Sequence, residues 1–284
     1  MMDDISDITA YYDRNPQVEH KRLEEHQLEY DLTWRFLEAY LPPSGEILEI
    51  GAGTGRYTLE LVQRGYTVTV VEISRANLDA CREYLAEAGL EHRVKYILGD
   101  GRYLRDVPEK EYDAVLLMGP LYHLVEEGDR RMAVREAYVH LRPGGVIFSA
   151  LISRFGIWGN ILKNFPKAIE FKDQIRYVLD NGSDHPDWQQ GGFRAYGATV
   201  DEIAPLHEDF GFETIKLVGV EPTISTNDDD ERYNKLEGER RLLWLDLLYE
   251  ISMEPSIVGA SRHLLYIGRK NQILQQKPNN FEET

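Results

Sequence analysis

Three glycines that directly follow an apolar run constrain this chain more than any other feature. Residues 47–50 are mostly aliphatic and predict a buried strand of a parallel sheet, and residues 57–63 predict the helix that follows. The glycines that separate strand and helix are Gly51, Gly53 and Gly55. Glycine can adopt a positive φ and leaves its backbone N–H groups accessible. The turn therefore predicts a site where a nucleoside-type ligand lies against the main chain, at the carboxyl edge of the sheet.

The spacing of the glycines argues against one familiar ligand. A dinucleotide fingerprint has the pattern Gly-x-Gly-x-x-Gly, whereas here the third glycine comes one residue early and Arg56 follows it. A nicotinamide-dependent oxidoreductase is therefore an alternative and not the first interpretation.

Further strands repeat the arrangement, and two of them are followed by an acid. The run 66–72 ends in Glu72, and the run 94–98 is followed by Asp100. A carboxylate can accept charge-assisted hydrogen bonds from both hydroxyls of a ribose. Five strand-and-helix units, with two last strands at 212–221 and 262–269, predict a Rossmann-like α/β fold. We expect a seven-stranded, mostly parallel sheet with helices on both faces, an N-terminal helical cap and an inserted lid.

The motif Glu-x-Gly-x-Gly-x-Gly, from Glu49 to Gly55, resembles motif I of the class I S-adenosylmethionine (SAM) dependent methyltransferases. The segment Leu-Arg-Pro-Gly-Gly over 141–145, expected to form a turn, is also typical of that family. The resemblance covers residues 11–153 and, more weakly, 199–270. It implies SAM as the cofactor and methyl transfer by in-line displacement, which needs no metal. A non-catalytic SAM-binding protein is the second alternative.

The resemblance also assigns roles to single residues. It implies that Glu72 binds the ribose, Asp100 binds the adenine amino group and Arg22 meets the SAM carboxylate, while an N-terminal tyrosine-rich segment closes over SAM. The expected cofactor-binding residues are Tyr11, Tyr12, Arg22, Glu49, Gly51, Ala52, Gly53, Gly55, Glu72, Ile73, Asp100, Gly101 and Met118.

The acceptor should lie after the fourth strand, where Tyr122 and His123 are the candidate catalytic residues. An imidazole with a pKa of roughly 6.5 suits the removal of a proton from an ammonium or a hydroxyl group. The alternative is that His123 holds its loop through a backbone hydrogen bond.

Charge and missing motifs narrow the acceptor. A net charge of −17 without a basic run disfavours nucleic acid. Gly119-Pro-Leu-Tyr122 stands where amino-methylating DNA enzymes carry Asn- or Asp-Pro-Pro and an aromatic residue, and the single cysteine, Cys81, lies far from the position of a cytosine-methylating nucleophile. We expect a small-molecule acceptor, with N, O, S or C attack left open, and a monomer or homodimer.

We predict one domain over residues 1–270. Its parts are a cap at 1–42, a core at 43–153, a lid at 154–198 and a C-terminal core at 199–270 with a helical insertion at 232–253, followed by a polar tail at 271–284. The acidic N-terminus lacks a secretory signal, and no apolar run is long enough for a membrane span. The expected location is therefore the cytoplasm, without membrane association.

Overall fold

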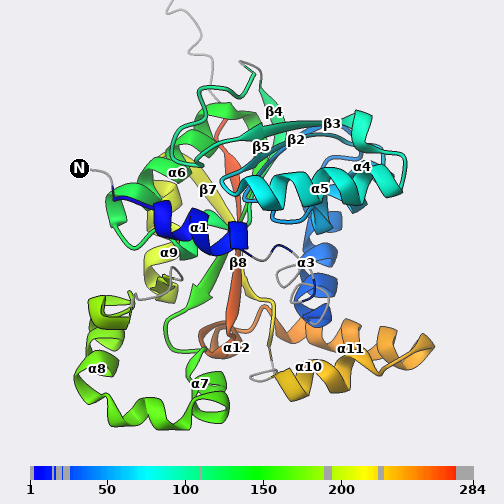
Figure 1. Ribbon diagram of the computed structural model, residues 1–284. Helices are drawn as coiled ribbons and strands as arrows, with labels where there is room; N and C mark the ends of the chain where they lie inside the picture. Colours follow the sequence, from blue (N-terminus) through cyan, green and yellow to red (C-terminus); the bar gives the residue numbers. More distant parts are fainter. Residues whose placement is uncertain are drawn as a thin grey trace, which may run out of the picture.

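The computed structural model describes residues 3–14, 16, 21, 26–108, 111–188, 194–222 and 227–272. Its centre is an eight-stranded sheet with the order β3-β2-β1-β4-β5-β8-β7, and β6 pairs with the end of β5 (Figure 1). The strands are β1 (Glu46–Ile50), β2 (Thr67–Glu72), β3 (Val94–Leu98), β4 (Tyr112–Leu117), β5 (Leu141–Ser153), β6 (Gly197–Ala198), β7 (Phe212–Gly219) and β8 (His263–Lys270). The prediction of a Rossmann-like sheet is confirmed, and β6 is a two-residue addition to the seven predicted strands.

Strand direction follows the expected pattern. β1 pairs in parallel with β2 and β4, β2 with β3, and β4 with β5. β8 is antiparallel to both β5 and β7. The carboxyl ends of β1 to β5 therefore meet at one edge, which is where open α/β sheets bind their ligands.

Helices cover both faces of the sheet. One apolar core joins the sheet to α3 (Gln27–Tyr40), α4 (Arg56–Gln63), α5 (Arg75–Glu87), α10 (Asn227–Asn234) and α11 (Gly238–Ile251). The other joins it to α6 (Glu127–His140), α9 (Val200–Glu208) and α12 (Pro255–Ala260), and includes Ile5 and Ile8 at the start of the chain. Ile8 belongs to α1 (Ser6–Arg14), which packs against α5. Short 3-10 helices are η1 (Glu91–Arg93), η2 (Pro120–Tyr122), η3 (Pro166–Glu170) and η4 (Pro186–Trp188).

The segment 154–198 contains α7 (Trp158–Asn164) and α8 (Lys172–Asn181), which extend away from α4 and α5 in Figure 1. The helices between β7 and β8 are α10 to α12. The domain boundaries drawn from the sequence stay a prediction. Among the described helices, none has both the length and the apolar composition needed to cross a bilayer.

The expected turn at residues 141–145 is wrong in detail. Leu141 already pairs with Tyr112, and Val146 pairs with Ala114, so the intervening residues bulge out of a strand that has started. Gly144 makes this bulge possible with a φ of 78°. The proline and glycines thus interrupt the register of β5 and do not delay its start.

Candidate functional site

The glycine turn has the conformation that the sequence predicts. Gly55 has a φ of 89°, and a Cβ built on it would lie 2.5 Å from Sγ of Cys81. Gly53 has a φ of 55° and no atom within 4 Å of its would-be Cβ. One glycine is therefore required by close packing against α5, while the other leaves open space beside the main chain.

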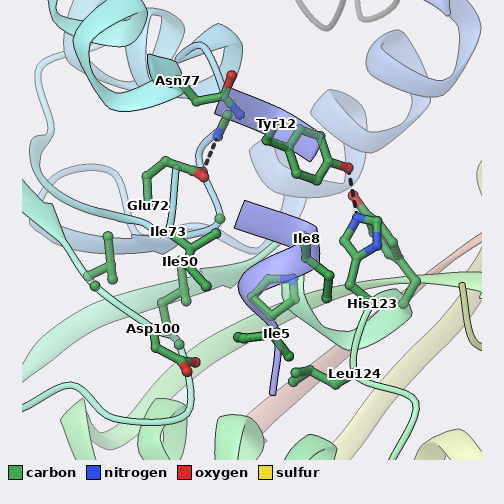
Figure 2. Close-up of a pocket in the computed structure, with 18 residues that line it drawn as sticks. Ile5, Ile8, Tyr12, Ile50, Glu72, Ile73, Asn77, Asp100, His123 and Leu124 are labelled. Carbon is green, nitrogen blue, oxygen red and sulfur yellow. Dashed lines mark hydrogen bonds between the residues drawn. The ribbon is translucent and has the colours of Figure 1, made fainter. Parts of the chain in front are cut away.

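That open space belongs to a cavity of about 650 Å³, its open mouth included, at the carboxyl edge of the sheet (Figure 2). Of the residues singled out from the sequence, the cavity is lined by Tyr12, Gly51, Gly53, Glu72, Ile73, Asp100, Gly101, Tyr122 and His123. We call it the first cavity.

Glu72 is fixed at the wall of the first cavity by two backbone donors. Its Oε2 accepts a hydrogen bond of 2.8 Å from the N–H of Gly53, drawn as a dashed line in Figure 2, and its Oε1 accepts one of 3.0 Å from Ser74. The side chain is nearly buried. A carboxylate held in one orientation still has lone pairs for donors on a ligand.

Asn77 is a lining residue that the sequence analysis missed. It lies in the first turn of α5, where its N–H donates to the capping Ser74, and it is only 2% exposed. Its Oδ1 is buried and has no hydrogen-bond partner among the described residues. Because such an atom is costly to bury alone, Asn77 indicates a donor that a ligand brings. Its position three residues after the N-cap of the helix that follows Glu72 could have identified it.

Asp100 also lines the first cavity, but it is paired within the protein. Both of its oxygens accept hydrogen bonds from Arg102, whose Nη1 also contacts Asp129 at 2.5 Å. Arg102 is almost fully buried. The charge of Asp100 is therefore partly compensated, which the sequence analysis did not anticipate.

Five predicted cofactor residues lie elsewhere. Glu49 is fully buried and accepts a hydrogen bond of 2.7 Å from Thr58, and burial raises its pKa to about 8. Through Thr58 it is bonded to the first turn of α4, and it does not line the first cavity. Ala52 and Gly55 do not line that cavity either, whereas Tyr11 and Met118 line a second cavity. Arg22 falls outside the described residues.

His123 is held through both ring nitrogens. Its Nδ1 lies 2.8 Å from the carbonyl oxygen of Arg194, and its Nε2 lies 2.7 Å from the hydroxyl of Tyr12 (Figure 2). A carbonyl oxygen only accepts, so Nδ1 donates, and in the neutral form of the ring Nε2 accepts a hydrogen bond from the hydroxyl of Tyr12. The backbone bond is the alternative arrangement that the sequence analysis gave for His123. A role as a base would require Tyr12 to move away.

Helix α1 covers the first cavity and is anchored at several points. Ile5, Ile8 and Tyr12 line the cavity from above. Asp13 accepts a hydrogen bond of 2.6 Å from the Ser74 hydroxyl, and Arg194 pairs with Asp3 and with Asp7. The N-terminal segment is thus tied both to the start of α5 and to residue 194.

A second cavity adjoins the first, with about 1210 Å³ of space. Tyr12 and Tyr122 line both cavities, so these two side chains form a common wall. The rest of the second cavity comes mainly from α3, the start of α4, the end of β5 and the start of β8. The segment 154–198 contributes Ile157 and Asn160 to the second cavity. These two residues and Ile152 also line a third, apolar cavity, whose other lining residues all come from the same segment, so the third cavity adjoins the second. The role of the segment as a lid stays a prediction.

Comparison with known proteins agrees with this geometry. Residues 47–145 match the family model described as a methyltransferase domain. Over these residues the chain is similar to methyltransferase domains, and its fold is that of a SAM-dependent methyltransferase structure.

The similarity to known methyltransferases extends over different shares of the chain. It is 26% identical over 183 residues to the putative methyltransferase YqeM of Bacillus subtilis, covering 63% of the chain and 64% of that relative. It is 28% identical over 176 residues to the ubiquinone biosynthesis O-methyltransferase of Methylobacterium nodulans, covering 61% and 62%. The chain thus spans less than two thirds of the length of these relatives. A SAM-dependent methyltransferase structure from Methanosarcina mazei superposes with a TM-score of 0.57 at 18% identity, covering 84% of the chain and 97% of that structure, which shows the shared fold.

Proposed function

We propose that this protein transfers a methyl group from SAM to a small-molecule acceptor, with SAM in the first cavity and the acceptor in the second. The observation that carries the proposal is the common wall of Tyr12 and Tyr122. In-line displacement requires donor and acceptor to approach from opposite sides of the transferred carbon. Two cavities that meet at two side chains provide that arrangement.

The residues of the first cavity fit the cofactor. Glu72 presents a fixed carboxylate for hydroxyl donors, Asn77 presents a buried carbonyl oxygen that lacks a described partner, and Gly53 leaves the main chain accessible. The bound cofactor would supply an activated methyl group on a sulfonium. The protein's own part is to bind the two molecules, orient them and exclude water.

The lining of the second cavity suits an organic acceptor. Its walls include Tyr11, Tyr30, Tyr57 and Met118, and such apolar and aromatic side chains commonly line small-molecule sites. The relative from Methylobacterium nodulans is named for a small-molecule pathway, which agrees with this proposal. The absence of nucleic-acid and membrane partners, the monomeric or dimeric state and the cytoplasmic location stay predictions.

Two measurements test the proposal. Calorimetry should show that the protein binds SAM and S-adenosylhomocysteine but not NADH, which would also set aside the oxidoreductase alternative. A metabolite library should then contain acceptors that cause S-adenosylhomocysteine release. Replacing Ile152 with Trp should block the second cavity and abolish turnover while SAM affinity is kept. SAM binding without turnover of any compound in a broad library would favour a non-catalytic SAM-binding protein.

A further inference from the structure

A compact cluster of charged side chains lies at the far end of the second cavity. It joins Glu29 in the first turn of α3, Glu221 just after β7, and His263 at the start of β8. Glu29 and His263 line the cavity, and Glu221 lies behind them, fully buried. Three separate parts of the chain thus bring two carboxylates and an imidazole together.

The donor atoms of the cluster converge on one point. Nδ1 of His263 lies 2.6 Å from an oxygen of Glu221 and 3.4 Å from an oxygen of Glu29, and one atom from each residue lies within 4.8 Å of the others. Nδ1 is buried and forms an ion pair with each carboxylate when the ring is protonated. The three groups thus face one another, as ligands around a shared centre do.

Charge balance points the same way. Arg262 donates to both oxygens of Glu221, so one of the two carboxylates is matched by a guanidinium that is itself buried. The other carboxylate, on Glu29, lies beside the same imidazole. Two neighbouring carboxylates repel one another in a partly buried setting unless a second positive charge lies between them. Without an ion the imidazole provides this charge as a proton, because the charges of Glu29 and Glu221 outweigh burial and raise the pKa of His263. A metal ion would replace that proton.

We propose that Glu29, Glu221 and His263 bind a divalent metal ion of the kind that takes mixed oxygen and nitrogen ligands, such as Mn²⁺, Co²⁺ or Zn²⁺. An ion held at about 2.1 Å from its ligands places neighbouring ligand atoms about 3 Å apart. The contacts of 2.6 and 3.4 Å lie on either side of that spacing. An organic ammonium group, which keeps about 2.8 Å to each acceptor, would need the three atoms further apart. The spacing therefore favours the metal.

Arg262 would act in this site as a hydrogen-bond partner that orients a metal ligand without binding the metal itself. Ligating carboxylates are commonly hydrogen-bonded from behind, which fixes their orientation. Arg262 fixes Glu221 in this way through Nε, at 2.8 Å, and through Nη2. Its positive charge also opposes a second cation nearby, so the metal affinity should be moderate.

The position of the cluster limits what the ion can do. Met118 lies beside the wall between the two cavities, because its carbonyl oxygen accepts a hydrogen bond from the hydroxyl of Tyr122. It follows Leu117, which pairs with Ser149 of β5, whereas His263 pairs with Ile152 of the same strand. Two strand spacings across the sheet and about two residues along it place His263 roughly 12 Å from Met118. The ion would therefore hold a distant, oxygen-bearing end of the acceptor and would take no part in methyl transfer itself. This assignment to the acceptor rests on the proposed function, whereas metal binding does not.

The test uses the full chain, freed of metal with EDTA and desalted, with no SAM or acceptor present. Titration with MnCl₂, followed by the electron paramagnetic resonance of free Mn²⁺, should show one ion bound per chain. Co²⁺ should give visible absorption bands typical of mixed nitrogen and oxygen ligands. Glu29→Gln and His263→Gln should each lower the affinity at least about tenfold. The matched controls Glu83→Gln and His92→Gln change exposed residues outside the cluster and should bind as the unaltered protein does.

Two results would overturn the proposal: no binding of Mn²⁺, Co²⁺ or Zn²⁺ by the unaltered protein at pH 8, or unchanged affinity in both cluster variants. If His263→Gln lowers the melting temperature, Glu29→Gln decides alone, because the Glu29 side chain is 25% exposed and lies at a helix end. Since no cofactor is present, a negative result leaves methyl transfer untouched. A failure to find methyl transfer would likewise leave a positive metal titration standing.

Discussion

The hydroxyl of Tyr12 donates a hydrogen bond of 2.7 Å to Nε2 of His123, across 111 residues of sequence. The bond joins the helix that covers the first cavity to the loop after β4 (Figure 2). Because Tyr12 also lies in the wall between the two cavities, the same contact positions the cover and the passage for the methyl group.

Tyr12→Phe removes this bond and keeps the ring. We expect SAM affinity to fall by about 2- to 10-fold, because a neutral hydrogen bond contributes about 0.5–1.5 kcal/mol. Calorimetry measures the affinity, and stopped-flow release should show that dissociation is faster. Tyr177→Phe is a matched control. Tyr177 lies on the distant α8, and its ring packs edge-on against that of His185. An affinity equal to that of the unaltered protein would mean that α1 is held without Tyr12.

His123→Ala distinguishes a positioning residue from a base. Both ring nitrogens are engaged by Tyr12 and by the Arg194 carbonyl, so we expect a loss of transfer rate that is the same at pH 6.5 and at pH 9. The pH profile of the rate, measured at saturating SAM, checks this. A loss that shrinks at high pH, where the acceptor loses its proton unaided, would instead assign His123 as the base.

Glu72→Gln should weaken SAM binding by about 1.5–3 kcal/mol, the range for a hydrogen bond to a charged group. The amide keeps the size of the carboxylate but places a donor beside the backbone N–H groups of Gly53 or Ser74. Part of the loss in SAM affinity will therefore come from a less stable glycine turn. A melting curve recorded without SAM measures that effect on stability separately. Glu87→Gln, at the exposed end of α5, is the control for a lost charge. Equal affinities for the two variants would exclude Glu72 from the site.

Asn77→Ala should lower SAM affinity without lowering the melting temperature of the protein alone. The buried Oδ1 has no described partner, so its removal takes away a desolvation penalty of about 1–3 kcal/mol along with some packing. A ligand that donates to this oxygen loses that bond in the variant. A large drop in the melting temperature with unchanged affinity would show that Asn77 is structural.

Glu49→Gln should change how stability depends on pH. Burial raises the pKa of Glu49 to about 8; the hydrogen bond from Thr58 acts in the opposite direction, and the charge of Glu72 adds to the rise. The folded state therefore holds a proton that the unfolded chain releases near its ordinary value of 4.5. Stability from this group is fully present below pH 4.5 and is lost as pH rises through 8, with a slope of up to about 1.4 kcal/mol per pH unit. Urea unfolding at pH 5.5, 7 and 8.5 should show a flatter dependence in Glu49→Gln, and parallel curves would contradict the prediction.

The sequence was most informative where the backbone alone determines position. Gly51 and Gly53 of the glycine turn, Glu72 and Asp100 follow directly from strand ends, and these four residues line the first cavity. Arg102 and Arg194 could not be placed, because their roles depend on partners 27 and more than 180 residues away. The direction of α7 and α8 could not be predicted, since the sequence shows where the segment 154–198 leaves the sheet but not where its helices extend.

The anchoring of α1 has a consequence for the order in which the chain can assemble on the ribosome. Helix α1 is made before its partners at Ser74, His123 and Arg194, of which Arg194 emerges last. The cover of the first cavity cannot reach its final place until Arg194 has been synthesised. A nascent chain stopped before residue 194 should therefore leave its first helix accessible to proteases, even when β1 to β5 have already formed.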